Sequence, residues 1–341
     1  MKIAIVETSL IDPFRDAGAR AIFDLQSSLV RLGFETKIFY ESEKLRSQIH
    51  KYKANAIIVS RCTTMARARD FKSLFNLPII LWAQDLESSR QSLYEKLNNK
   101  PAQGSLLATL REKNAILAAD ITVFPTQKDV DAASRKYPSN NIVCHPYFFF
   151  GAHRQDLTYQ RKKDLVFIGS PGHLPNVDGL NWFLESCWTK VVEKSEKSNL
   201  WVIGDWNTND FKNYPGVHFT KQISETNVNR IMQGSMIGIS PLRFGAGLKR
   251  KTLQYLHSGL LTVATDYGLE GLPSEEDDTC WRRANTSDDF VAATLKALED
   301  PEKTVDIALA GQQFLLNHYS EEIFDDNLCD ILNAVGLKSR I

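Results

Sequence analysis

The 341-residue sequence contains no long apolar run, few cysteines and no net charge. No stretch approaches the roughly 18 consecutive apolar residues of a membrane-spanning helix, and the apolar start, Met1 to Val6, is shorter than the core of a signal peptide. The five cysteines are widely spaced and include no Cys-x-x-Cys pair, which argues against a disulfide framework and against a zinc site. We therefore expect a cytoplasmic protein that needs no metal.

The charge is balanced over the whole chain but not within each half. Residues 1–150 contain 21 Lys and Arg against 15 Asp and Glu, a balance of +6, whereas residues 151–341 contain 20 against 26, a balance of −6. A positive N-terminal half suits an anionic partner, such as a polyanionic glycan or the inner face of a membrane. Peripheral membrane contact therefore stays open, and we do not expect nucleic acid as a partner.

The length and composition indicate two globular domains. A chain of this size, with 43% hydrophobic and 24% charged residues, can bury a full core in each of two domains. We predict an N-terminal domain over 1–150, a polar linker over 151–163 and a C-terminal domain over 164–320. We also expect a final helix over 321–341, which would pack back on the N-terminal domain.

Strands and helices alternate in both predicted domains. This alternation predicts two Rossmann-like, doubly wound parallel sheets, which would face each other across a ligand-binding cleft. The predicted strands cover 2–7, 35–40, 56–60, 78–82, 121–124, 142–145, 164–169, 200–204, 217–219, 236–240 and 260–264. The predicted helices cover 19–32, 43–52, 64–75, 87–97, 104–118, 127–136, 176–193, 224–233, 287–299, 301–317 and a segment after Gly247.

One stretch, Ile237 to Asp266, combines a short apolar strand, a Gly-x-Gly turn and an amphipathic helix. The turn, at Gly245 and Gly247, would let the first free N–H groups of the helix point toward the loop and form an anion site. We expect the three cations Lys249–Lys251 in the first turn of the helix, where positive charge is unfavourable unless an anion lies between them. A phosphate is the natural candidate, although an ordinary helix connection with a solvated basic turn stays open.

Other clusters point less clearly to a function. His173 and His257 are single histidines without metal-ligand spacing, so we interpret them as local hydrogen-bonding residues. The acidic run Glu275–Asp278 is a weak metal candidate, and we interpret it as a solvated loop.

Four motifs together resemble a known family. The segments Phe167 to Phe183, Leu200 to Gly204, Pro241 to Lys249 and Val263 to Gly271 occur in the order and spacing seen in retaining glycosyltransferases of family four. The resemblance is specific over about 164–320 and weaker in the N-terminal half. It implies the two-domain fold called GT-B, with a nucleotide sugar bound to the C-terminal domain as donor substrate and no separate cofactor.

The resemblance also implies which residues hold the donor diphosphate. Lys249 and Lys251 match the basic residues near the diphosphate, and Arg243 is a third candidate cation. The backbone amides after Gly245 and Gly247 match the phosphate-binding loop of the family.

The rest of the donor pocket follows from the same resemblance. Thr265, Gly268 and Leu269 lie where the family lines this pocket. Gly204 and Asp205 close a strand near the expected nucleobase.

On the acceptor side, the resemblance assigns residues in the N-terminal half. Asp16 and Arg20 belong to a segment similar to the glycine loop that faces the sugar and phosphate in the family, and Gly18, in the same segment, is assigned to the binding of the donor. Asp85 and Glu87 lie where many relatives carry an Asp-Leu-His segment.

The sequence departs from the family pattern at three positions. Two glutamates eight positions apart are usual, one near the sugar and one at the ribose, and the matching positions are Ala246 and Gln254. Gln254 can still accept a hydrogen bond from the ribose, but it lacks the charge that strengthens such a contact. Glu87 stands where a histidine is frequent, so the donor is held differently or catalysis is weakened.

These features predict a glycosyltransferase that acts on a nucleotide-diphosphate sugar, with retention of configuration. The acceptor would be a glycan or lipid-linked molecule in the synthesis of a cell-surface polysaccharide or glycoconjugate. The alternative, favoured by the three departures, is a catalytically silent relative that binds a nucleotide or glycan or supports an active partner.

Overall fold

The computed structural model describes residues 1–8, 17–65, 72, 75–86, 88, 95, 105–138, 140–151, 161–208, 211, 214–221 and 223–338. The chain forms two compact units. The N-terminal unit comprises Met1–Phe149 and Glu321–Ile341 together with the short segment Ala246–Leu248, and the C-terminal unit comprises Phe150–Gly245 and Lys249–Ser320. No helix within the described part of the chain is long and apolar enough to cross a membrane.

The N-terminal unit is built on a six-stranded sheet of order β2-β1-β3-β4-β5-β6, in which every strand pair is parallel. Its strands are short runs rich in Ile and Val, as expected where both faces of a sheet are covered. They are β1 (Lys2–Glu7), β2 (Glu35–Tyr40), β3 (Ala56–Ser60), β4 (Ile79–Trp82), β5 (Ile121–Phe124) and β6 (Ile142–Cys144).

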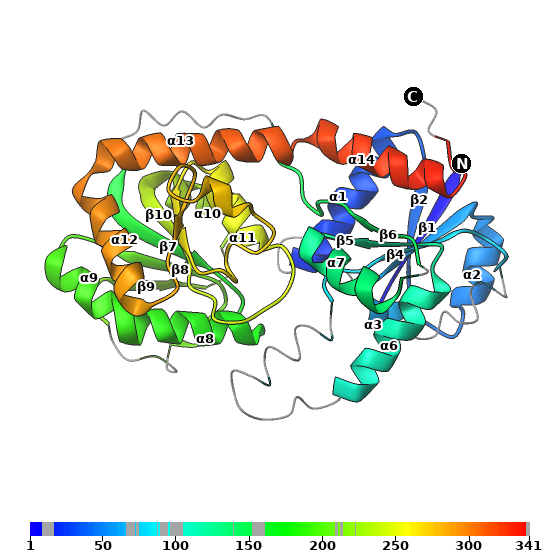
Figure 1. Cartoon of the computed structure of the whole chain (residues 1–341), viewed down its shortest axis with the longest axis horizontal. Coiled ribbons are helices and arrows are strands. Elements are labelled where there is room, and N and C mark those ends of the chain that lie inside the picture. The colour runs from blue at the N-terminus through cyan, green and yellow to red at the C-terminus, as the bar shows by residue number, and fades with distance from the viewer. Residues whose placement is uncertain are drawn as a thin grey trace. The chain divides into compact units, whose positions relative to one another are not determined.

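Helices cover this sheet (Figure 1). They are α1 (Ala17–Arg31), α2 (Leu45–Tyr52), α3 (Cys62–Met65), α6 (Ser105–Ala118), α7 (Gln127–Lys136) and α14 (Glu321–Ala334). One apolar core joins β1, β3 and β4 to α2, α6 and α7 through residues such as Val6, Ile49, Leu81 and Ile116. The predicted helix over 64–75 is described only in part, and the predicted helix over 87–97 lies almost wholly outside the described residues.

The last helix, α14, packs on α1 within the N-terminal unit. The Asp325 carboxylate accepts two hydrogen bonds from the Arg31 guanidinium, at 2.8 and 2.7 Å, and another from the Ser28 hydroxyl. Phe324 is fully buried and meets the His145 ring edge-on, with ring centroids 4.4 Å apart. Burial lowers the pKa of His145 to about 4, so this histidine is neutral and serves packing.

The C-terminal unit is built on a second six-stranded parallel sheet, of order β12-β11-β10-β7-β8-β9. Its strands are β7 (Lys162–Ile168), β8 (Leu200–Ile203), β9 (Val217–Thr220), β10 (Ser235–Ser240), β11 (Leu261–Ala264) and β12 (Arg282–Arg283). The two parallel sheets confirm the predicted fold class of two Rossmann-like α/β domains.

Helices cover both faces of the second sheet (Figure 1). They are α8 (Leu174–Phe183), a π-helical turn (Leu184–Trp188), α9 (Thr189–Lys194), α10 (Glu225–Gly234), α11 (Arg250–His257), a 3₁₀ turn (Ser274–Glu276), α12 (Ser287–Glu299) and α13 (Pro301–His318). Alternate residues of β7 serve the two faces, because Phe167 packs toward α8 and α12 whereas Val166 packs toward α10 and α11.

Two sequence expectations need correction in this unit. The helix predicted over 176–193 is interrupted by the π-helical turn, where the buried Trp188 donates a 2.8 Å hydrogen bond from Nε1 to the Pro215 carbonyl. The helix after Gly247 begins at Arg250, so Lys249 is its N-terminal cap residue, in extended conformation, and not part of the first turn.

Candidate functional site

In the C-terminal unit, the sequence-predicted donor residues lie after the carboxyl ends of three strands, β8, β10 and β11. The chain leaves β7 toward β8 on one side and later returns to β10 on the other side, so the strand order reverses between β7 and β10. Ligands of open α/β sheets bind at the carboxyl ends of the strands beside such a switch point. The residues after β7 and after β10 are therefore the first to consider.

Lys251 and Asn176 meet at this switch point. Lys251 lies in the first turn of α11, which follows β10, and Asn176 lies in the first turn of α8, which follows β7. The Lys251 amine donates a 2.6 Å hydrogen bond to Asn176 Oδ1, while Asn176 Nδ2 donates to the Ser170 carbonyl at 3.0 Å. Because both ends of the amide are used, Asn176 fixes the position of the lysine head group.

The Lys251 head group is enclosed in an unusual environment for a cation. It lies 4.3 Å above the centre of the Phe167 ring, and within the described residues no carboxylate pairs with it. Burial, and then the charge of Lys249, lower the pKa of Lys251 to about 7 from its usual value of 10.5. An anion placed beside this lysine would supply the counter-charge that the described residues do not.

Lys249 is held differently. Its ammonium forms a 3.1 Å ion pair with Glu270, and both side chains are nearly buried. A Cβ on Gly245 would lie 3.4 Å from Lys249 Cε, so the lysine stem runs over this glycine. Glu270 offsets the charge of Lys249, and Lys251 is therefore the lysine of the two whose charge is uncompensated.

Arg243 is engaged by a carboxylate of its own. Its guanidinium donates to both oxygens of Asp178 in a two-pronged ion pair, with Nε 2.8 Å from Oδ2. This pair ties the loop after β10 to α8. Close packing supports the same tie, since a Cβ on Gly179 would lie 2.6 Å from the Pro241 carbonyl.

The loop after β11 is bonded to the same neighbourhood. The Thr265 hydroxyl donates to the Leu242 carbonyl and accepts from the Gly268 N–H at 3.3 Å. Thr252 of α11 donates to the Gly268 carbonyl at 2.7 Å, and Leu269 is buried. These bonds fix the loop after β11 to α11.

Glycines allow the close approaches that this edge requires. A Cβ on Gly204 would lie 2.1 Å from the Gly169 carbonyl, and a Cβ on Gly268 would lie 2.4 Å from the Ser240 carbonyl. Gly245 and Gly247 have φ values of +143° and +75°, which L-amino acids rarely adopt. The backbone conformation of the predicted Gly-x-Gly turn therefore favours glycine at both positions. Asp205, which follows Gly204, is exposed.

Gln254 is partly buried in the second turn of α11. Its Oε1 accepts a 3.3 Å hydrogen bond from Arg250, four residues earlier on the helix. The side chain at the predicted ribose position therefore already accepts a hydrogen bond from a neighbouring cation.

In the N-terminal unit, the predicted donor residue Gly18 and the predicted acceptor-side residues lie on different elements. Gly18 and Arg20 are in the first turn of α1, where Arg20 forms a 2.7 Å ion pair with the buried Asp24. Asp85 follows β4 and is partly buried. Asp16 and Glu87 lie outside the described residues.

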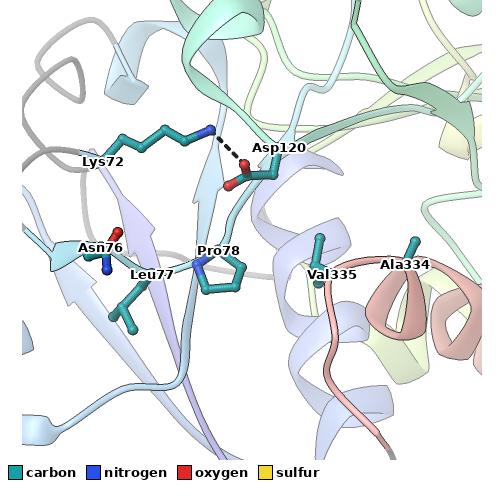
Figure 2. A pocket seen from close by; sticks show the side chains of 7 residues that line it. All are labelled: Lys72, Asn76, Leu77, Pro78, Asp120, Ala334 and Val335. Carbon is teal, nitrogen blue, oxygen red and sulfur yellow. Dashed lines mark hydrogen bonds and ion pairs between the residues drawn. The ribbon is translucent and has the colours of Figure 1, made fainter.

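The N-terminal unit also has a cavity, which lies near the amino ends of strands β4 and β5. Figure 2 shows this cavity, of about 410 Å³, between the residues before β4 and β5 and the end of α14. Its polar groups are engaged, because Asp120 accepts from Lys72 at 2.6 Å and from the Ile79 N–H at 2.9 Å. It lies at the amino ends of the strands, where parallel sheets do not place their ligands.

Carboxylates of the acidic run Glu275–Asp278 bind neighbouring side chains. Among the described residues, no group of three or more His, Cys, Asp and Glu side chains could hold a metal ion. Asp277 instead accepts from Trp281 Nε1 at 2.6 Å and from Arg283, and Asp278 accepts from Arg282 at 2.8 Å. These carboxylates brace a loop.

The sequence motifs contained Asn176, Asp178 and Glu270 but gave no reason to single them out. Asn176 is 75 residues from Lys251 along the chain, and Glu270 is 21 residues from Lys249. Only the strand order brings these partners together, so spacing within a motif could not reveal them.

Comparison with known proteins gives a family match within the C-terminal unit. Residues 162–300 match the family model described as Glycosyl transferases group 1. A 163-residue segment is 24% identical to an uncharacterized 44.6 kDa protein in the cps region of Klebsiella pneumoniae, and the match spans 45% of this chain and 40% of that protein.

Solved structures match over nearly the whole chain. Sucrose-phosphate synthase from Thermosynechococcus elongatus aligns with a TM-score of 0.78 at 11% identity, covering 98% of this chain and 99% of its own. HepE of Anabaena, solved in complex with UDP and glucose, aligns with a TM-score of 0.70 at 11% identity, covering 98% and 100%.

These findings define the class of the protein. The chain has the two-domain fold of GT-B glycosyltransferases, and its residues 162–300 match the model of the glycosyl transferases group 1 family. The predicted resemblance to glycosyltransferases with the GT-B fold is thereby confirmed.

Proposed function

We propose that this protein transfers a sugar from a nucleotide-diphosphate sugar to a hydroxyl group of a glycan or lipid-linked acceptor, with retention of configuration, in the synthesis of a cell-surface polysaccharide or glycoconjugate. The observation that carries the proposal is Lys251, a partly buried lysine at the switch point of the C-terminal sheet that pairs with no carboxylate among the described residues. The anion that this position suits is the diphosphate of the donor.

The chemistry follows from the charge that develops during transfer. When the bond between the sugar and the diphosphate breaks, negative charge accumulates on the leaving diphosphate. Lys251 and its neighbour Lys249 are fixed before the reaction, so they can stabilise this charge without reorganising. Arg243 is a weaker candidate, because Asp178 already engages its guanidinium.

UDP is the first donor nucleotide to test, because HepE, a protein of the same fold, was solved with UDP and glucose. We would titrate the full chain with UDP-, GDP- and dTDP-sugars by calorimetry and follow sugar release or transfer in parallel. Binding of one nucleotide class with turnover supports the proposal. If no nucleotide sugar binds, the proposal is wrong.

The catalytically silent alternative rests on three departures from the family pattern: Ala246 and Gln254, which replace the two usual glutamates, and Glu87, which replaces a frequent histidine. The same titration separates the two functions. Tight binding without turnover against any acceptor would favour a silent protein that binds a nucleotide or glycan.

We also infer peripheral contact with an anionic membrane, through helix α6. Leu106, Leu110 and Leu117 are 74%, 47% and 52% exposed and share one helical face, in which Lys113 is also exposed. Exposed leucines with a cation among them are typical of a helix that lies at a lipid surface, and the N-terminal half carries a charge balance of +6.

Vesicle flotation tests this contact. The wild-type chain should float with vesicles that contain phosphatidylglycerol and not with pure phosphatidylcholine, and the double variant Leu106→Asp/Leu110→Asp should not float with either. Leu309→Asp, which changes a 43% exposed leucine of α13, is the matched control and should float like wild type. Flotation of the double variant with anionic vesicles would contradict the contact.

A further inference from the structure

A buried carboxylate lies at the carboxyl end of β1 in the N-terminal sheet. Glu7 is 1% exposed, and its Oε1 accepts from the Thr8 N–H at 2.8 Å and from the Thr8 hydroxyl at 2.9 Å. Its other oxygen, Oε2, has no hydrogen-bond partner among the residues that the structure describes. A buried acceptor left unsatisfied lowers stability, so its presence calls for an explanation.

Arg61 stands beside this carboxylate. It follows β3, the neighbour of β1, and its Nε lies 3.8 Å from Glu7 Oε1. Its backbone has a φ of +71°, a left-handed conformation that is costly for a residue with a long side chain. The chain runs from β1 to β2 on one side and returns to β3 on the other, so Glu7 and Arg61 mark the switch point of this sheet.

Gln84 completes the cluster from the loop after β4. A Cβ on Gly18, in the first turn of α1, would lie 2.3 Å from Gln84 Oε1 and 2.8 Å from an Arg61 guanidinium nitrogen. Both side chains therefore converge over this glycine. Gln84 Nε2 is buried and, in the described part of the chain, has no acceptor.

The cluster thus offers an unused acceptor, Glu7 Oε2, and an unused donor, Gln84 Nε2, beside a guanidinium. A group that donates and accepts at the same time is a hydroxyl. An anion would be repelled by Glu7, and a cation would be repelled by Arg61. The group that fits is a hydroxyl of a neutral polyol, and a sugar presents several.

We propose that Glu7, Arg61 and Gln84 bind a sugar unit of the acceptor by its hydroxyl groups. This assignment rests on the proposed glycosyltransferase function and adds to it the residues that recognise the acceptor. Arg61, at 33% exposure, and Gln84 are both partly exposed, and Arg61, with the longer side chain, is the one that moves to admit the sugar.

The test uses the full chain saturated with UDP and a panel of methyl glycosides of glucose, galactose, mannose and N-acetylglucosamine. Binding is followed by saturation-transfer NMR. At least one glycoside should bind wild type, and Glu7→Gln, which keeps the shape but removes the charge, should raise its Kd about tenfold. UDP affinity should stay within twofold of wild type.

Asp120→Asn is the matched control, because it removes one carboxylate at the opposite edge of the same sheet and should bind the glycoside like wild type. If thermal unfolding shows that Glu7→Gln does not fold, the same binding measurement is made on Gln84→Leu, which should also raise the Kd of the glycoside about tenfold. The proposal is wrong if UDP binds and no glycoside binds wild type, or if the variant keeps wild-type affinity. Failure of UDP itself to bind would instead contradict the proposed function.

Discussion

The Lys251 amine donates a 2.6 Å hydrogen bond to Asn176 Oδ1, and this bond joins the first turns of two helices that follow neighbouring strands, β10 and β7. It places an amine at the switch point of the C-terminal sheet without neutralising it. A carboxylate in place of Asn176 would have held the same lysine but cancelled its charge. The amide therefore keeps the lysine positioned and available to an anion.

The first prediction concerns this choice of amide over carboxylate. Asn176→Asp should raise the pKa of Lys251, and the new carboxylate should offset the charge of the protonated lysine. Affinity for UDP-glucose, measured by calorimetry, should therefore fall about tenfold. Asn227→Asp, at an exposed position of α10, adds the same charge away from the site and should change affinity less than twofold. Tighter binding in Asn176→Asp would show that Lys251 does not face the diphosphate.

The second prediction concerns pH. Because the pKa of Lys251 in the free protein is about 7, and a bound diphosphate would raise it, binding should take up a proton above pH 7. Affinity for UDP-glucose, whose diphosphate does not titrate in this range, should fall about tenfold between pH 7 and 8.5.

Stability of the free protein should change in the opposite direction with pH. The folded pKa lies below the unfolded value of 10.5, so between pH 7 and 10.5 the unfolded chain binds more protons, and the Lys251 contribution to the free energy of unfolding rises with pH.

The control for the binding prediction is Lys251→Met. In this variant, the fall in UDP-glucose affinity with pH and the proton uptake on binding, measured in buffers of different ionisation enthalpy, should both disappear. A pH-independent affinity in wild type would contradict the assignment.

The third prediction concerns Gln254. If this residue faces the ribose, Gln254→Glu should tighten nucleotide binding by about 1 kcal/mol, roughly the difference between a neutral and a charge-assisted hydrogen bond. Arg250 already donates to Gln254, and it would then compete for the new carboxylate. Unchanged or weaker binding would mean that the ribose is held elsewhere.

The fourth prediction concerns the fold of the site. Gly204 has a φ of +150° and packs its Cα against the Gly169 carbonyl, so Gly204→Ala should lower the free energy of unfolding by about 2–4 kcal/mol in a urea titration. Gly234→Ala, at the end of α10 where a Cβ meets nothing within 4 Å, should change it by less than about 1 kcal/mol. Equal effects in the two variants would show that the close approach at Gly204 is not needed.

Much of the fold could be predicted from local pattern. Runs such as Ile3 to Val6 and Ile237 to Ile239 are short and β-branched, and they end at turn-forming residues, so their strands and the alternation with helices were readable. The π-helical turn at Leu184–Trp188 and the two-residue strand Arg282–Arg283 were not predicted, because tertiary contacts, not local sequence, define them.

The candidate site was predictable in its residue types but not in its pairings. A glycine turn with following lysines indicated an anion site from sequence alone. That Lys249 is paired with Glu270, whereas Lys251 is held by a neutral amide, depends on the strand order and on burial. Neither is visible in the spacing of residues, and the same holds for Glu7 and Arg61 in the N-terminal sheet.

The central claim, that Lys251 binds the donor diphosphate, is tested most directly by comparing a nucleoside diphosphate with its nucleoside. Affinities of wild type and Lys251→Ala for both molecules are measured by calorimetry or NMR, with Lys190→Ala, an exposed lysine of α9, as control. Lys251→Ala should weaken the diphosphate at least tenfold, leave the nucleoside within twofold, and lower turnover by roughly two orders of magnitude. An equal loss for both molecules, or a diphosphate affinity and turnover within twofold of wild type, would contradict the claim.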